Sequence, residues 1–219
     1  RRWQMNVEVK GKKAVGSCST AGIGLAIANR LAQEGAEVWL NGRTQNRVEQ
    51  AIAQLGKDVT VHGIAADLGT AAGCAEVVRQ LPQLDILVNN VGIFEPKPFE
   101  KISDAEWEKF FAVNVLSGVR LSRAYLDGMK ERNWGRIVFI SSESGLQIPA
   151  EMIHYGTTKT APLAIARGVA VTARTAVGAP APFPPGLGLA QAGLAALGKP
   201  AELERATDAF AAALERGDA

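Results

Sequence analysis

A tyrosine and a lysine placed one helical turn apart are the residues of this sequence best suited to proton transfer. Tyr155 and Lys159 stand in the segment Tyr-Gly-Thr-Thr-Lys. On a helix, residues i and i+4 lie on the same face, so the phenol and the ammonium project together. A nearby ammonium favours the phenolate over the neutral phenol, which makes the pair a usable proton shuttle. The spacing also arises by chance, so its weight depends on what accompanies it.

Two polar residues could complete a site around this pair. Ser142 lies thirteen positions before Tyr155 and follows a predicted strand, where its hydroxyl can hold and polarise a carbonyl oxygen. Ser141 and Ser144 offer the same group nearby. Asn114 interrupts an apolar stretch and needs partners if it is buried, so it marks either a water relay to Lys159 or a helix-packing bond.

A glycine-rich turn predicts a phosphate-binding site near the amino end of the chain. Residues 17–24 read Ser-Cys-Ser-Thr-Ala-Gly-Ile-Gly and stand between a predicted strand and a predicted helix. Such a turn offers unpaired amides and the positive end of a helix dipole, which suits a pyrophosphate. Gly22 lets the backbone approach the ligand closely, and Gly24 lets the helix pack tightly on the sheet.

The elements that must position these residues follow a βα rhythm. Short aliphatic runs alternate with longer helical patterns, which predicts one α/β domain over residues 1–219: a Rossmann-like, doubly wound parallel sheet flanked by helices in three layers. The predicted strands are 14–17, 37–40, 59–65, 86–89 and 136–140, and the predicted helices are 24–33, 45–55, 71–81, 104–131, one carrying Tyr155, and 201–216. Ser103 and Glu106 predict a capping box, and Pro162 predicts a kink. Residues 1–9 form an N-terminal extension and 174–219 a divergent C-terminal segment.

These motifs, in this order, resemble those of the short-chain dehydrogenase/reductase family over about residues 10–175. The turn is similar to the family's Thr-Gly-x-x-x-Gly-x-Gly, and Asn89-Asn90-Val91-Gly92 is similar to its Asn-Asn-Ala-Gly. The resemblance implies a catalytic set of Asn114, Ser142, Tyr155 and Lys159. The cofactor contacts that it implies are Cys18, Ser19, Thr20, Gly22, Ile23, Gly24, Arg43, Asp67, Leu68, Asn90, Gly92, Tyr155 and Lys159.

One position departs from the family pattern, since Cys18 stands where the family has its first turn glycine. If the position requires a positive φ, a cysteine costs on the order of 1 kcal/mol or more, and its side chain could crowd the cofactor.

The second predicted strand indicates which cofactor is bound. It is followed by Asn41-Gly42-Arg43, without the carboxylate that would bind the ribose hydroxyls of NAD. Gly42 leaves space, and Arg43 could bind a 2′-phosphate, so we expect NADP(H) rather than NAD(H). Alternatively, Arg43 is a solvated residue at a helix start. Asp67 and Leu68 resemble the family's adenine-contacting pair, although an Asp capping the next helix is an alternative.

The composition and charge of the sequence favour a small molecule as the binding partner. The net charge is +2 and the basic residues are scattered, which argues against nucleic acid or a membrane surface as partner. Without an apolar leader in the given sequence we expect a cytoplasmic protein with Cys18 and Cys74 reduced, and no zinc spacing is present.

The expected activity is an NAD(P)-dependent interconversion of a ketone, or a ketoacyl thioester, and a secondary alcohol, in a homodimer or homotetramer by family resemblance. An epimerase or dehydratase shares the cofactor turn but usually needs a longer chain. The non-enzyme alternative is a catalytically weak or inactive nucleotide-binding protein that retains the fold. Beyond Lys159 the pattern weakens, with Pro185-Gly186 the nearest match to the family's sixth-strand segment.

Overall fold

The computed structural model describes residues 9–56 and 58–176. Most of the expected N-terminal extension, the predicted helix 201–216 and the Pro185-Gly186 segment lie outside these residues.

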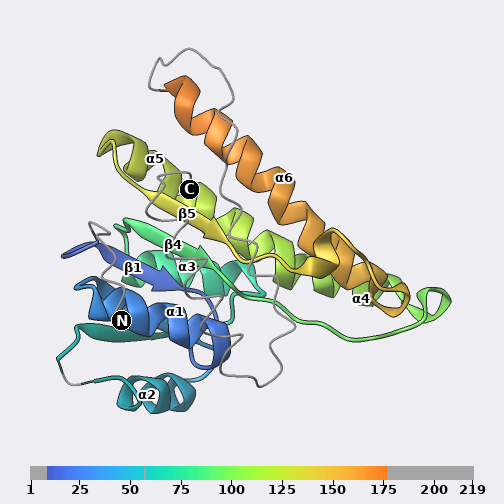
Figure 1. The fold of residues 1–219 in the computed structure, drawn as a ribbon, viewed down its shortest axis with the longest axis horizontal. Coiled ribbons are helices and arrows are strands. Elements are labelled where there is room, and N and C mark those ends of the chain that lie inside the picture. Colours follow the sequence, from blue (N-terminus) through green and yellow to red (C-terminus); the bar gives the residue numbers. More distant parts are fainter. Residues whose placement is uncertain (1–8, 57, 177–219) are drawn as a thin grey trace, which may run out of the picture.

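A five-stranded parallel sheet forms the centre of the described structure (Figure 1). Its strands are β1 (Lys13–Gly16), β2 (Glu37–Gly42), β3 (Val61–Ala65), β4 (Ile86–Asn89) and β5 (Arg136–Phe139). Their order in space is β3-β2-β1-β4-β5, which confirms the predicted doubly wound sheet. The chain reverses its winding direction between β1 and β4, and the crevice outside the carboxyl ends of these strands is where such sheets bind ligands.

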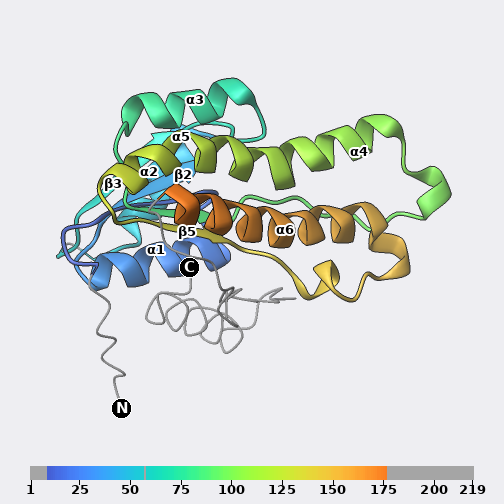
Figure 2. The same cartoon turned by 90° about the horizontal axis from the view of Figure 1, so that it is seen from above.

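Helices cover both faces of the sheet, as predicted (Figure 2). On one face, α1 (Gly22–Gln33) and α2 (Gln45–Ala53) bury Ile27, Leu31 and Ala51 against the sheet. On the other face, α3 (Ala71–Gln80) and α5 (Ser117–Glu131) bury Val77 and Leu121. Every residue of β4 is buried, because a parallel strand with helices on both sides has no solvent-facing side.

The predicted single helix 104–131 is wrong in one respect. The structure divides it into α4 (Asp104–Phe111), a π-helical turn η2 (Ala112–Leu116) and α5. The extra residue per turn lets Asn114 reach partners in the β4–α4 segment. A hydrophobic period in the sequence does not reveal such an insertion. The capping box at Ser103 and Glu106 is confirmed.

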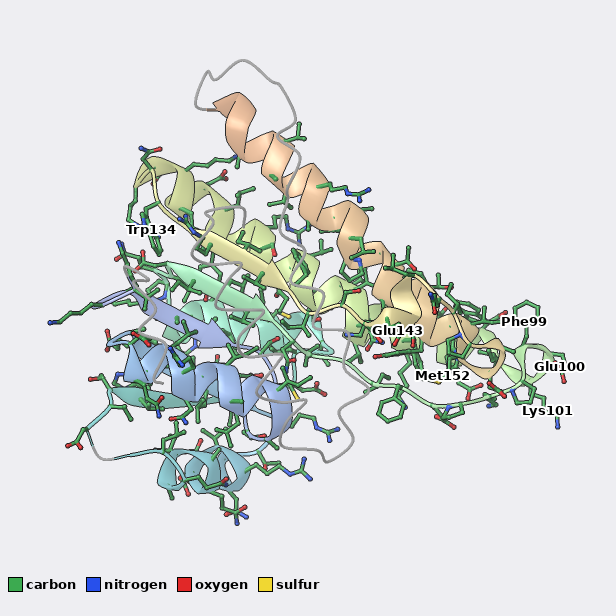
Figure 3. The ribbon with its side chains drawn as sticks, in the orientation of Figure 1. Phe99, Glu100, Lys101, Trp134, Glu143 and Met152 are labelled. Carbon is green, nitrogen blue, oxygen red and sulfur yellow. The ribbon has the colours of Figure 1, made fainter. Side chains whose placement is uncertain are left out.

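Two connections extend beyond the carboxyl edge of the sheet. The β4–α4 segment carries the 3₁₀ turn η1 (Phe99–Lys101), and the β5–α6 segment carries η3 (Glu143–Gly145) and η4 (Ala150–Met152). Figure 3 shows Phe99, Lys101 and Met152 together at one end of the molecule, opposite Trp134. Lys97 N donates to Glu151 O at 2.7 Å and joins the two connections.

The last described element, α6 (Ile153–Ala176), carries Tyr155 and Lys159 and packs against β5, α4 and α5. It continues through Pro162, and Figures 1 and 2 show one continuous helix where the sequence predicts a kink. The proline removes one amide donor, while packing along α6 holds the remaining turns in place.

Candidate active site

The glycine-rich turn is joined to the end of β4 by the first residue of the motif. Ser17 Oγ accepts hydrogen bonds from Asn90 N at 2.7 Å and from Val91 N at 3.0 Å. In return, Asn90 Nδ2 donates to the carbonyl oxygens of Ser17 at 3.3 Å and Cys18 at 3.2 Å. The two strand ends that border the crevice are therefore linked by four bonds between short polar groups.

Asn41 links the same turn to β2 and β3, a role that sequence reasoning missed. Its side chain is buried, and its Nδ2 donates to Ile64 O at 3.2 Å and to Ala66 O at 3.1 Å. Its Oδ1 accepts from Cys18 N at 3.2 Å. The available signal was a polar amide within an apolar strand, because such a residue is buried only with its hydrogen bonds satisfied.

Cys18 has a left-handed backbone conformation, which is the condition under which a cysteine at this position is costly. Its φ is 53°, and Gly22 has a φ of 56°. Gly24 is required for a different reason, since a Cβ there would lie 2.7 Å from Asn90 Nδ2 and would overlap the Cys18 carbonyl oxygen. The Cys18 side chain is exposed, and desolvation by the surrounding turn raises the pKa of its thiol, against the nearby charges of Arg43 and Arg47.

The amino end of α1 has the form of an anion site. Its N-cap, Ala21, has no side chain that can accept from the first-turn amides, whereas Thr70 caps α3 and Ser103 caps α4. The amides of Gly22, Ile23 and Gly24 are therefore left for a ligand. A Cβ built on Gly22 meets nothing within 4 Å, so the turn leaves room above it. These features fit the pyrophosphate of a dinucleotide.

Lys159 brings a buried ammonium to the carboxyl edge of the sheet. The residue is 6% exposed, and its Nζ donates to the carbonyl oxygen of Ile140 at 3.0 Å. Burial disfavours the charged form and lowers the pKa of Lys159 to about 8. Its Nζ lies 5.8 Å from the centroid of the Tyr155 ring. The structure thus brings together the two residues that the helical spacing pairs.

Gly92 belongs to the same group of residues. A Cβ at this position would lie 3.2 Å from Lys159 Nζ and 3.7 Å from Asn114 Oδ1. A side chain at this position, three residues beyond the end of β4, would press on the ammonium, which accounts for the glycine here.

Asn114 and Thr158 hold the Lys159 turn against the β4–α4 segment. Asn114 Oδ1 accepts from Ile93 N at 2.8 Å, and its Nδ2 donates to Ile93 O at 2.9 Å and to Thr158 Oγ1 at 3.0 Å. Thr158 is fully buried and donates in turn to Tyr155 O at 2.8 Å. These bonds leave only the second lone pair of Asn114 Oδ1, or its main-chain carbonyl, for a relay water. Thr158 is a positioning residue that the sequence did not single out.

The three serines after β5 have different surroundings. Ser141 is buried and donates to Lys159 O at 2.7 Å, so its hydroxyl is engaged in packing. Ser142 is half-buried, and its Oγ accepts from Ser144 N at 3.2 Å, which leaves its own proton to donate. Tyr155 is also half-buried and its ring lies 6.1 Å from that of Phe94.

The remaining predicted cofactor residues follow the ends of β1, β2 and β3 and differ in exposure. Arg43 follows β2 and is exposed. Asp67 Oδ1 accepts from Gly69 N at 3.0 Å within its own turn, and Thr70, not Asp67, caps α3. The Leu68 side chain is buried in the core. Ser19 is buried and its Oγ donates to Gly16 O at 2.7 Å, while Thr20 lies against Gly42.

Residues 9–56 and 58–176 hold no group of three or more His, Cys, Asp or Glu side chains able to bind a metal ion. None of the helices in these ranges combines the length and the apolar character needed to cross a membrane.

A parallel sheet with an uncapped helix at a glycine-rich turn, beside a buried lysine and a tyrosine, defines a dinucleotide-binding α/β protein of the oxidoreductase type. The family model for short chain dehydrogenase matches residues 13–178. The chain belongs to this family.

Individual relatives agree with this assignment. The uncharacterized oxidoreductase YvaG of Bacillus subtilis is 47% identical over 169 residues, covering 76% of this chain and 64% of that protein. D-beta-hydroxybutyrate dehydrogenase of Cupriavidus necator is 35% identical over 182 residues, covering 80% and 70%. The crystal structure of L-sorbose reductase from Gluconobacter frateurii, complexed with NADPH and L-sorbose, has a TM-score of 0.74 at 32% identity, covering 79% and 68%. The chain thus spans about two thirds of the length of these relatives.

Proposed function

We propose that the protein interconverts a ketone and a secondary alcohol with NADP(H), chiefly as a reductase. The observation that carries this proposal is the Lys159 ammonium, which is buried beside Tyr155 and Gly92 without a counterion among the described residues. No carboxylate lies within ion-pair distance of it among the described residues. Burying a charge without a counterion is unfavourable, and a proton-transfer role accounts for its retention.

Each residue of the site has its own role in the proposed reaction. When bound, the nicotinamide supplies a hydride to the carbonyl carbon. Ser142 donates a hydrogen bond to the carbonyl oxygen, and Tyr155 transfers its phenolic proton to that oxygen as the C=O π pair moves onto it. The resulting phenolate is stabilised by the Lys159 ammonium, which then returns a proton to it. Asn114 keeps Lys159 aligned through Thr158.

The preference for NADP(H) rests on the end of β2. A Cβ on Gly42 would lie 2.6 Å from Thr20 Cγ2 and 3.1 Å from Val48 Cγ2, so the packing leaves no place there for a carboxylate-bearing side chain. The next residue is the exposed Arg43, whose guanidinium suits a phosphate dianion. The sorbose reductase named above was solved with NADPH, which supports the same choice.

The reaction is tested by following NADPH absorbance with a panel of ketones and ketoacyl thioesters. Tyr155→Phe removes only the phenolic hydroxyl, and we expect turnover to fall by a factor of about 100 or more, in line with the usual contribution of a general acid. Turnover that is unchanged by this substitution would contradict proton transfer by Tyr155. Arg43→Ala should weaken NADPH binding more than NADH binding, and equal losses would refute the 2′-phosphate assignment.

A nucleotide-binding protein without turnover is the second candidate. Cys18 favours it, because this residue with a side chain has a φ of 53° at the position where the family turn has glycine. Dinucleotide binding by calorimetry, with no turnover over the full substrate panel, would select this candidate.

We also propose a cytoplasmic homodimer or homotetramer. Phe111 is 36% exposed and Leu116 is 40% exposed on neighbouring helical turns, which suits a subunit contact. Light scattering of the purified chain tests the oligomeric state.

A further inference from the structure

The residues that lead into α2 are held against the glycine-rich turn. Ser19 N donates to Asn41 O at 2.9 Å, and Asn41 N donates to Ser19 Oγ at 2.9 Å. Gly42 then packs directly on Thr20. These contacts bring the residues that follow β2 to the outer side of the turn, where Cys18 is exposed.

Two arginines lie at the start of α2, beside the glycine-rich turn. Arg43 follows the last residue of β2, and Arg47 lies in the first turn of α2, on either side of the N-cap Thr44. Both are exposed, and neither forms an ion pair with another described residue. The nearest acidic residue along α2, Glu49, accepts a hydrogen bond from Gln45 at 2.9 Å.

The two guanidinium groups act on one point of the turn. The contacts of Ser19 with Asn41 and of Thr20 with Gly42 hold the start of α2 beside Cys18. Consistent with this placement, both arginine charges lower the pKa of the Cys18 thiol, against a larger rise due to desolvation. Two like charges four residues apart at one helix start repel each other, and a dianion bound by both would offset that repulsion. The Thr44 side chain does not cap α2, so the first amides of this helix add a positive potential at the same place.

We propose that Arg47 is a second residue that determines cofactor specificity, and that it binds the 2′-phosphate of NADP(H) together with Arg43. This inference rests on the proposed function for the identity of the ligand. It goes further in assigning a residue on α2 that neither the glycine-rich turn nor the end of β2 contains. A phosphate has three terminal oxygens, so two guanidinium groups can bind it from different sides.

The test measures binding and not turnover. NADP⁺ and NAD⁺ are titrated by calorimetry into the full chain carrying Arg47→Ala, Arg47→Lys or no substitution, at low and at physiological salt. We expect Arg47→Ala to weaken NADP⁺ binding roughly tenfold, as for loss of a charge-assisted bond, and to change NAD⁺ binding by less than about twofold. Arg47→Lys should recover part of the loss, and added salt should shrink the difference.

A matched control removes an exposed arginine elsewhere. Arg123 is exposed on α5, which covers the opposite face of the sheet from α2, so Arg123→Ala should leave both affinities unchanged. Equal weakening of both dinucleotides by Arg47→Ala, or no weakening of NADP⁺, would overturn the assignment. Failure of the unsubstituted chain to bind either dinucleotide would overturn it together with the cofactor site. Binding without turnover of any ketone would overturn only the proposed reaction.

Discussion

Replacing Cys18 with glycine should stabilise the protein, because the backbone of this residue has a φ of 53°. An L-residue with a side chain in the left-handed region costs roughly 1–2 kcal/mol, and glycine avoids that cost. Glycine also loses more conformational freedom on folding, which offsets roughly 0.5–1 kcal/mol of the gain. The exposed thiol contributes little burial that would be lost. The net expectation for Cys18→Gly is a gain of about 0.5–1 kcal/mol in the free energy of unfolding.

Two neighbouring variants separate the backbone from the thiol. Cys18→Ala removes the sulfur and keeps a Cβ, so it should leave the stability within about 0.5 kcal/mol of the parent. Gly22→Ala introduces a Cβ at a φ of 56°, where nothing lies within 4 Å, so only conformational strain is added. It should lower the stability by about 0.5–1 kcal/mol, the mirror image of the change at Cys18.

The assay is urea unfolding of the full chain, followed by circular dichroism with reduced thiols and no cofactor. A change of this size moves the midpoint temperature by about 1–4 °C in a chain of this length, so thermal scans provide a second measurement. The reasoning would be refuted if Cys18→Ala matched Cys18→Gly, since the thiol and not the backbone would then be responsible. A loss of stability in Cys18→Gly would refute it equally.

Three further predictions concern buried polar groups. Burial lowers the pKa of Lys159 to about 8, so ketone reduction, which consumes a proton, should slow as the pH rises through about 8 while alcohol oxidation speeds up. Initial rates in both directions from pH 6 to 10 check this, and rate profiles without an inflection near pH 8 would contradict it. Asn41→Ala leaves the carbonyls of Ile64 and Ala66 without their partner and should cost roughly 2–4 kcal/mol in urea unfolding; a cost under about 1 kcal/mol would contradict the role assigned to Asn41. Burial also lowers the pKa of His154, so the unfolded chain takes up the proton first and stability should fall as the pH drops below about 6.5. His154→Leu should reduce that loss between pH 7.5 and 5.5, and an identical loss in both proteins would show that other groups cause it.

Much of the fold could be predicted because its signals are local. The apolar run that begins at Ile86 predicts β4, and its bounds are confirmed as Ile86–Asn89. Other elements differ by one or two residues at their ends, as with β2, which continues to Gly42 because it pairs with β3 as far as Ala65. That extension depends on the neighbouring strand, which a local hydrophobic pattern does not contain.

The parts that could not be predicted depend on contacts between distant segments. In the sequence, Asn41 is only a polar residue near the end of a predicted strand. In the structure, its side chain forms hydrogen bonds with main-chain groups of Cys18, Ile64 and Ala66. Thr158 reads as one of two adjacent threonines, yet only this one meets Asn114. The π-helical turn at Ala112–Leu116 has no sequence signal beyond the polar residue inside it. Each of these features exists only once two elements have packed.

The segment from Asn90 to Gly92 explains why the cofactor turn and the proton-transfer pair should respond differently to substitution. Asn90 bonds to Ser17 and Cys18 on one side, while Gly92 abuts Lys159 on the other. Three residues therefore separate the part of the crevice that would bind the phosphates from the part that holds Tyr155 and Lys159. A change at Cys18 acts on the first part and leaves the second in place, so it should alter the KM for the cofactor and not kcat. A side chain at Gly92 would press on the ammonium, and should alter kcat.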